Sequence, residues 1–105
     1  MLQQDLRRLT LQTSGEGFTD LTAALNREIA ASGLQRGVAT LVALHTSCSL
    51  TVNENADPRV LQDLAAYLQA LVPQHGLRSL DADPVRYVYR HDDEGPDDMP
   101  AHIRT

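Results

Sequence analysis

The sequence has 105 residues, of which 42% are hydrophobic, and a formal net charge of -5. This length has room for one hydrophobic core, so we expect a single domain over residues 1–105, and the acidic balance disfavours nucleic acid as a partner. There is neither a run of about 20 apolar residues nor a basic N-terminal region ahead of an apolar block, so we expect no membrane contact and a cytoplasmic location.

The first part of the chain carries a strand pattern, a helix pattern and a second strand pattern. Residues 8–13 alternate polar and apolar side chains, which predicts a half-buried strand. A helix is expected after Thr19 as N-cap, because apolar residues recur every four positions over residues 21–29, and Gly33 would end it. Residues 37–44 are apolar at odd and even positions alike, which is typical of a central strand covered on both sides.

The strongest helix pattern follows Asp57, an N-cap residue ahead of Pro58, whose missing N–H costs nothing at the first helical position. Pro73 is expected to end this helix. Its predicted buried face consists of Val60, Leu61, Leu64, Leu68 and Leu71. A loop is expected over residues 74–83, and a short strand over residues 85–90, which are rich in β-branched and aromatic side chains.

An acidic stretch, residues 91–98, leads into a last short helix. Asp97 or Asp98 would cap this helix, and Pro100 would lie in its first turn. The sequence stops at Thr105, inside the predicted helix, without a C-cap or a closing strand. We therefore expect the 105 residues to be a C-terminally truncated form of the domain.

The first candidate site is the segment from residue 45 to residue 54. If this segment is a strand, alternate side chains place one polar row on a single face, made of His45, Ser47, Ser49, Thr51 and Asn53. Such a row suits a polar ligand or a bound phosphate, and it equally suits the solvated face of an antiparallel sheet. Cys48 would face the other way, so we interpret it as a small buried hydrophobic residue rather than a nucleophile activated by His45.

The second candidate site is the segment from residue 91 to residue 102, which contains two histidines, one glutamate and four aspartates without a basic residue. If the segment is an exposed acidic loop, solvent alone would screen its negative charge. Alternatively, the segment holds a metal ion. The nitrogen donors would then be His45, His91 and His102. The oxygen ligands or proton carriers would come from Glu94, Asp97 or Asp98.

Several phrases, in this order, resemble the YjbQ-like family: His45-Thr46-Ser47, Asn53-Glu54, Asp57-Pro58, Tyr89-Arg90-His91 and Glu94-Gly95-Pro96-Asp97-Asp98-Met99-Pro100-Ala101-His102-Ile103. The resemblance covers the whole chain, and members of the family are described as secondary thiamine-phosphate synthase enzymes. It implies an α+β fold in which two main helices pack on an antiparallel sheet, and assembly as a homotrimer. It also implies a further quarter of chain, rich in strands, beyond Thr105.

The resemblance also implies a function. The enzyme would join a pyrimidine-methyl pyrophosphate to a thiazole phosphate, with a divalent metal, zinc or magnesium, and a phosphorylated small molecule as its partner. By position, the catalytic residues would be His45, Glu54, Glu94 and Asp98. The substrate-binding residues would be Thr46, Ser47, Ser49, Asn53, Gly95 and Asp97, and the metal ligands His45, His91 and His102. The same residues would serve a metal-dependent binding protein or a metal-assisted hydrolase, so both alternatives stay open.

Overall fold

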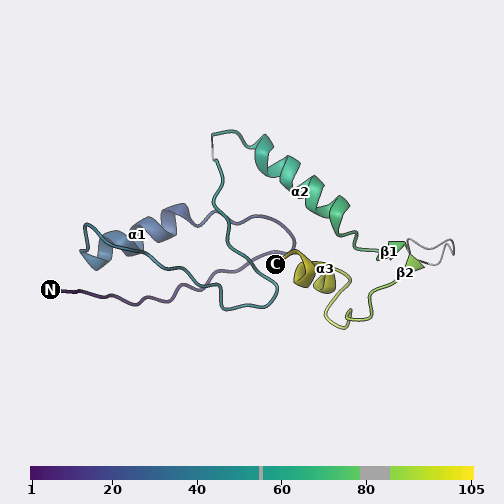
Figure 1. Ribbon diagram of the computed structural model, residues 1–105, viewed down its shortest axis with the longest axis horizontal. Coiled ribbons are helices and arrows are strands. Elements are labelled where there is room, and N and C mark those ends of the chain that lie inside the picture. Colours follow the sequence, from purple (N-terminus) through teal and green to yellow (C-terminus); the bar gives the residue numbers. More distant parts are fainter. Residues whose placement is uncertain (55, 79–85) are drawn as a thin grey trace. The chain divides into compact units, whose positions relative to one another are not determined.

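The structure is a computed structural model of residues 1–105, and it describes all of them except residue 55 and residues 79–85 (Figure 1). The described elements are α1 (Thr22–Ser32), α2 (Arg59–Leu71), β1 (Leu77–Arg78), β2 (Arg86–Tyr87) and α3 (Asp98–Arg104). The chain divides into two compact units, Met1–Leu41, which contains α1, and Val42–Thr105, which contains the other elements. That residues 1–105 form one domain stays a prediction.

The expected α+β fold, with two helices on an antiparallel sheet, is wrong. In the part of the chain that the structure describes, the only ladder is the two-residue pair β1–β2, in which Leu77 lies opposite Tyr87. Residues 8–13, 37–44 and 45–53 form no strand. Alternating side chains predict an apolar face, but a strand also needs a neighbour that takes up its backbone hydrogen bonds. Without that neighbour the apolar side chains stay in water, and Val38 is 95% exposed.

The two later predictions for strand and loop are also only partly met. β2 covers two residues of the strand expected over 85–90, and residue 85 lies outside the described residues. β1 lies within the loop expected over 74–83, of which residues 79–83 are likewise outside the described part. Gly76, just before β1, has a positive φ of 90°, and a Cβ there would collide with the backbone carbonyl of Tyr87. Glycine therefore permits the close approach of the two short strands.

The interpretation of Cys48 as a buried hydrophobic residue is wrong, because Cys48 is exposed. Its expected neighbours on the same strand face are exposed as well, and Val52 reaches 99%. The interpretation assumed a sheet with a second layer against one face. In the described residues no such sheet forms, so strand parity does not decide which side chains are buried.

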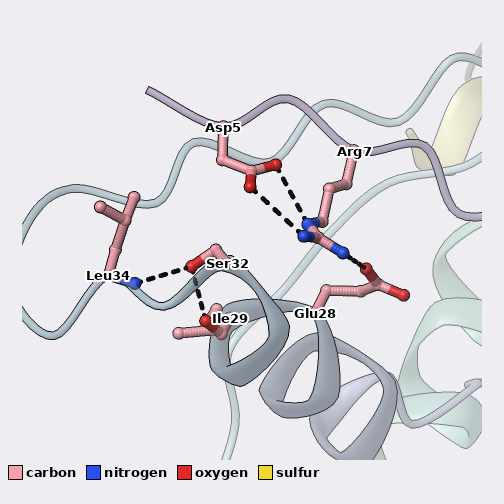
Figure 2. Close-up of polar contacts among 6 residues, drawn as sticks. All are labelled: Asp5, Arg7, Glu28, Ile29, Ser32 and Leu34. Atoms are coloured by element: carbon pink, nitrogen blue, oxygen red, sulfur yellow. Dashed lines mark hydrogen bonds and ion pairs between the residues drawn. The ribbon is translucent and has the colours of Figure 1, made fainter. Parts of the chain in front are cut away.

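The helix α1 ends where the sequence predicts and begins slightly later. Its first residue, Thr22, donates its backbone N–H to Asp20 Oδ1 at 2.9 Å, so the capping side chain is Asp20 and not Thr19. Gly33 ends the helix in the left-handed region, at φ 74°, and its N–H bonds the carbonyl of Ala30. Figure 2 shows Ser32 Oγ donating a hydrogen bond to the Ile29 carbonyl and accepting one from the backbone N–H of Leu34.

A charged cluster ties the chain before α1 to the helix. Arg7 Nη1 lies 3.0 Å from Glu28 Oε2, and Arg7 Nε lies 3.0 Å from Asp5 Oδ1 (Figure 2). Hydrogen bonds to Asp5 and then to Glu28 raise the pKa of Arg7 above its ordinary value. The cluster is exposed, so water and salt screen it and its contribution to stability is small.

α2 begins at Arg59, one residue after the predicted start, and Asp57 caps it as predicted. The backbone N–H of Arg59 donates to Asp57 Oδ1 at 2.9 Å, and Pro58 already has helical angles of -62° and -18°. The helix ends at Leu71, two residues before Pro73. The predicted buried face is only half-buried: Val60, Leu61, Leu64 and Leu68 are intermediate, and Leu71 is exposed.

A small core joins the end of α2 to α3 within the unit Val42–Thr105. Among the described residues, the buried ones are Val72, Gly76 and Pro100, and Pro100 lies in the first turn of α3 as predicted. Arg104 Nη2 donates to the carbonyl of Val72 at 2.8 Å, which attaches the last turn of α3 to the end of α2. None of the helices in the described residues has the length and apolar character that a membrane crossing needs.

The cap of α2 makes a pH-dependent prediction. Hydrogen bonds from the Arg59 side chain, and then from its backbone, lower the pKa of Asp57 below its ordinary value of 3.8. A carboxyl group with a depressed folded-state pKa stabilises the fold above its unfolded-state pKa and loses that effect as the pH falls through the folded-state value. We therefore expect Asp57→Asn to lower the urea midpoint at neutral pH, with a difference from wild type that shrinks as the pH drops below 3.8.

Urea unfolding followed by far-ultraviolet circular dichroism measures this difference. Asp63→Asn is the matched control, because Asp63 lies within α2, beyond the first turn and its free backbone N–H groups. The control should change the midpoint little at either pH. An Asp57→Asn effect that is as large in acid as at neutral pH would contradict the role assigned to the carboxylate.

Candidate functional site

Asp98, the first residue of α3, lies between two histidines. Its Oδ2 is 3.0 Å from His91 Nε2, and its Oδ1 is 3.4 Å from His102 Nε2. Asp98 and His102 are four residues apart on one helix, so they share a face. His91 is the first residue of the acidic stretch, and its ring meets that of His102 edge to face at 5.2 Å between centroids. The Asp98 side chain is 17% exposed, so two imidazoles and the helix shelter it from water.

The hydrogen bond at the other nitrogen of His102 fixes which ring atom carries the proton. Nδ1 lies 3.2 Å from the backbone carbonyl oxygen of Thr46. A carbonyl only accepts, so Nδ1 must be the donor, and the neutral ring then has its lone pair on Nε2. That lone pair faces Asp98 Oδ1, which is also an acceptor. A cation between these two atoms, or a second proton on the ring, would make the contact attractive.

A divalent cation fits this arrangement. One ligand atom from each of His91, Asp98 and His102 can be chosen so that all three lie within 4.8 Å of one another. Ligands of a tetrahedral zinc ion at about 2.0 to 2.1 Å are roughly 3.4 Å apart. Asp98 Oδ1 lies at that distance from His102 Nε2, and the 3.0 Å contact with His91 Nε2 is made by the other carboxylate oxygen, Oδ2. A histidine that binds a metal commonly donates its second ring N–H to a backbone carbonyl, as His102 does to Thr46.

His45 belongs to a different arrangement beside this group. It precedes a turn at Thr46 and Ser47, and its Nδ1 accepts from the backbone N–H of Ser47 at 3.0 Å. Ser47 Oγ also lies 3.0 Å from the same nitrogen. Within the described residues, the metal-ligand group contains His91, Asp98 and His102 but not His45.

The two arrangements share one pocket of about 280 Å³, which is partly open to solvent. Its lining residues are His45, Thr46, Ser47, His91, Asp93, Glu94, Asp98 and His102. The structure thus brings together residues of both segments that the sequence singled out. The lining, all of it in the described part of the chain, contains three carboxylates and no lysine or arginine.

The other predicted site residues lie outside the lining of this pocket. Ser49 and Glu54 are exposed, and Asn53 Nδ2 donates to Thr51 Oγ1 at 3.3 Å. Asp97 and Gly95 shape the chain before α3: the Asp97 carbonyl accepts from the backbone of Ala101, and the Gly95 carbonyl from that of Asp98. The positive φ of 132° at Gly95 favours glycine for this turn. Their roles in binding a substrate stay predictions.

Three residues that bear on the site were not predicted from the sequence. Asp93 lines the pocket, and its place beside Glu94 in the acidic stretch was the available signal. Arg104 anchors α3 through its bond to Val72, and Thr105 Oγ1 lies 3.4 Å from the Thr46 carbonyl. No pattern marks such bonds, because every residue offers a backbone carbonyl.

The anchor formed by Arg104 can be tested separately from the chemistry of the site. A helix of seven residues is marginal by itself, so α3 depends on its contacts with the end of α2. We expect Arg104→Gln to lower the free energy of unfolding by about 1.5 to 3 kcal/mol, the range for a hydrogen bond with one charged partner. Urea unfolding measures the loss. Arg36→Gln, at an exposed position in the other unit, is the control, and equal effects of both substitutions would refute the anchor.

Residues 7–105 match the family model described as UPF0047 protein YjbQ-like. A UPF0047 protein of Synechocystis is 41% identical over 97 residues, which are 92% of this chain and 59% of that protein. The UPF0047 protein YjbQ of Salmonella typhimurium is 37% identical over 102 residues, 94% of this chain and 64% of that protein. The chain thus spans about three-fifths of the length of these curated relatives. No solved structure matches it.

Proposed function

Because the chain belongs to the UPF0047 family of YjbQ-like proteins, we propose that it is a metal-dependent protein that acts on a phosphorylated small molecule. The reaction we propose is the one that the family resemblance implies, the joining of a pyrimidine-methyl pyrophosphate to a thiazole phosphate. The observation that carries the metal dependence is the position of Asp98 between two imidazole nitrogens.

The donor set favours zinc over magnesium. Two imidazoles and one carboxylate suit zinc or iron, whereas magnesium prefers a shell of oxygen atoms and retained water. Three protein ligands also leave a position open, as in catalytic zinc sites. A bound divalent cation would supply Lewis acidity and offset the charge of a departing pyrophosphate. His91, Asp98 and His102 are the residues proposed to hold it.

In the proposed reaction a C–N bond forms between the thiazole nitrogen and the pyrimidine methylene carbon, while the C–O bond to pyrophosphate breaks. The protein residues bind and orient the two substrates within the pocket, where Thr46 offers a hydroxyl group and Ser47 positions His45. Glu94 lines the same pocket and would accept a proton or orient the acceptor substrate. Proximity of this kind is a large part of the rate enhancement in two-substrate reactions.

A second function, a metal-dependent binding protein without turnover, is favoured by the charge of the pocket. Asp93, Glu94 and Asp98 contribute three negative charges, and the lining residues supply no guanidinium or ammonium group against them. One divalent cation leaves a net charge of about -1, so long-range attraction does not draw a phosphorylated ligand in. A phosphorylated ligand would therefore have to be held by direct contact with the cation.

We further propose assembly as a homotrimer and a cytoplasmic location. Exposed apolar side chains in the unit Val42–Thr105, such as Leu44 and Val52, are the kind of surface that a contact between subunits covers. The sequence contains a single cysteine, Cys48, which fits a reducing compartment because it cannot form an intramolecular disulfide.

Metal binding is the first prediction of this proposal. Purified protein loaded with zinc and then desalted should retain about one equivalent, measured by elemental analysis. His91→Ala and His102→Ala should each weaken zinc binding by roughly tenfold or more, because each removes one of three ligands. His75→Ala is the matched control, since His75 is exposed and outside the pocket. Equal zinc content in all four proteins would refute the proposed metal site.

The reaction is a separate prediction. With both thiamine precursors and the divalent metal, the protein should form thiamine phosphate and pyrophosphate in equal amounts, and His102→Ala should reduce the rate at least tenfold while His75→Ala leaves it unchanged. Chromatography of the products and an assay for pyrophosphate measure both outputs. Release of inorganic phosphate alone would favour a hydrolase. Binding of the precursors that needs metal but gives no product would favour the binding protein.

A further inference from the structure

Ser47 determines which nitrogen of His45 carries a proton. A backbone N–H is always a donor, so the 3.0 Å contact from Ser47 N makes His45 Nδ1 an acceptor. The protonated imidazolium has no acceptor nitrogen, and the neutral ring with hydrogen on Nδ1 has none at that position. The contact therefore selects the neutral ring with its hydrogen on Nε2. Ser47 Oγ, at 3.0 Å from Nδ1, donates to the same lone pair.

This protonation state makes Nε2 of His45 a hydrogen-bond donor and leaves neither ring nitrogen free to bind a metal. Nδ1 is taken up by Ser47, and Nε2 carries the hydrogen. His102 shows the reverse assignment, since its Nδ1 donates to the carbonyl of Thr46 and its Nε2 faces Asp98. The two histidines line one pocket with opposite capacities. One offers an N–H, and the other offers a lone pair.

The backbone carbonyl of Thr46 connects the segments that carry the two histidines. Thr46, which follows His45, accepts the hydrogen bond from His102 through its carbonyl oxygen. The same carbonyl accepts from Thr105 Oγ1 at 3.4 Å, and that hydroxyl lies 2.9 Å from the His102 carbonyl. The turn that carries His45 is therefore attached to α3, which carries His102 and Asp98.

We infer that His45 binds the oxyanion of the substrate, donating from Nε2 to a phosphate oxygen, while His91, Asp98 and His102 hold the cation that binds the same phosphate group. The inference rests on the proposed metal site and deepens it by naming the ligand class as a phosphate group bound by metal and imidazole together. Ser47 is a positioning residue, because it acts on the ligand only through His45. A hydrogen bond from a neutral N–H to a phosphate oxygen is charge-assisted, because the acceptor is ionised.

The test uses the zinc-loaded protein with inorganic phosphate as the probe, followed by isothermal titration calorimetry. His45→Ala should bind phosphate roughly tenfold or more weakly than wild type, the loss expected for one hydrogen bond to a charged group, with unchanged zinc content. Ser47→Ala keeps the backbone N–H that selects the protonation state, so its affinity should change less than that of His45→Ala. His75→Ala is the control for loss of an exposed histidine.

A second readout does not depend on phosphate. In a long-range proton–nitrogen spectrum of the wild-type protein, His45 should carry its hydrogen on Nε2. Hydrogen on Nδ1, or unchanged phosphate affinity in His45→Ala, would overturn the inference. Loss of zinc in His45→Ala would overturn it as well, because His45 would then be a metal ligand. Failure of wild-type protein to retain zinc would instead refute the proposed metal site, which separates the two outcomes.

Discussion

The hydrogen bond from His102 Nδ1 to the carbonyl of Thr46 is the contact on which the candidate site depends. It joins two segments separated by more than fifty residues of chain, and at 3.2 Å it also orients the imidazole. Because the carbonyl must accept, Nδ1 is the donor, and the other ring nitrogen, Nε2, faces Asp98. This backbone contact thus joins α3 to the turn at Thr46 and orients the imidazole that α3 carries. Without it, Asp98 and His102 would be two neighbours on a short helix.

The site is formed by polar contacts between segments of the chain, and it is not a cleft in a large hydrophobic core. Two of the few buried described residues, Val72 and Pro100, support α3, and the bond from Arg104 adds to that support. The acidic lining raises the electrostatic cost of a phosphate ligand and lowers that of a cation. This balance explains why a bound metal is central to both proposed functions, the transferase and the binding protein.

The helices and the site were largely predictable from the sequence, and the sheet was not. The Asp57-Pro58 start of α2 and the stop at Gly33 are local signals, since the side chains act on backbone groups within a few residues. The density of histidine and acidic residues between His91 and His102 likewise pointed to the segment in which His91, Asp98 and His102 lie close together, and that they bind a metal stays a prediction. Strand pairing depends on a distant partner that no alternation pattern names, so the pattern at residues 37–44 and the burial of Cys48 were misread.

The most direct test of the account is the X-ray absorption spectrum of the zinc-loaded protein at the zinc edge. The account predicts two imidazole ligands with nitrogen at about 2.0 Å, together with oxygen from Asp98 and solvent. A ligand shell without imidazole scattering would contradict it, as would a sulfur atom at about 2.3 Å, which would place the metal at Cys48 and away from α3.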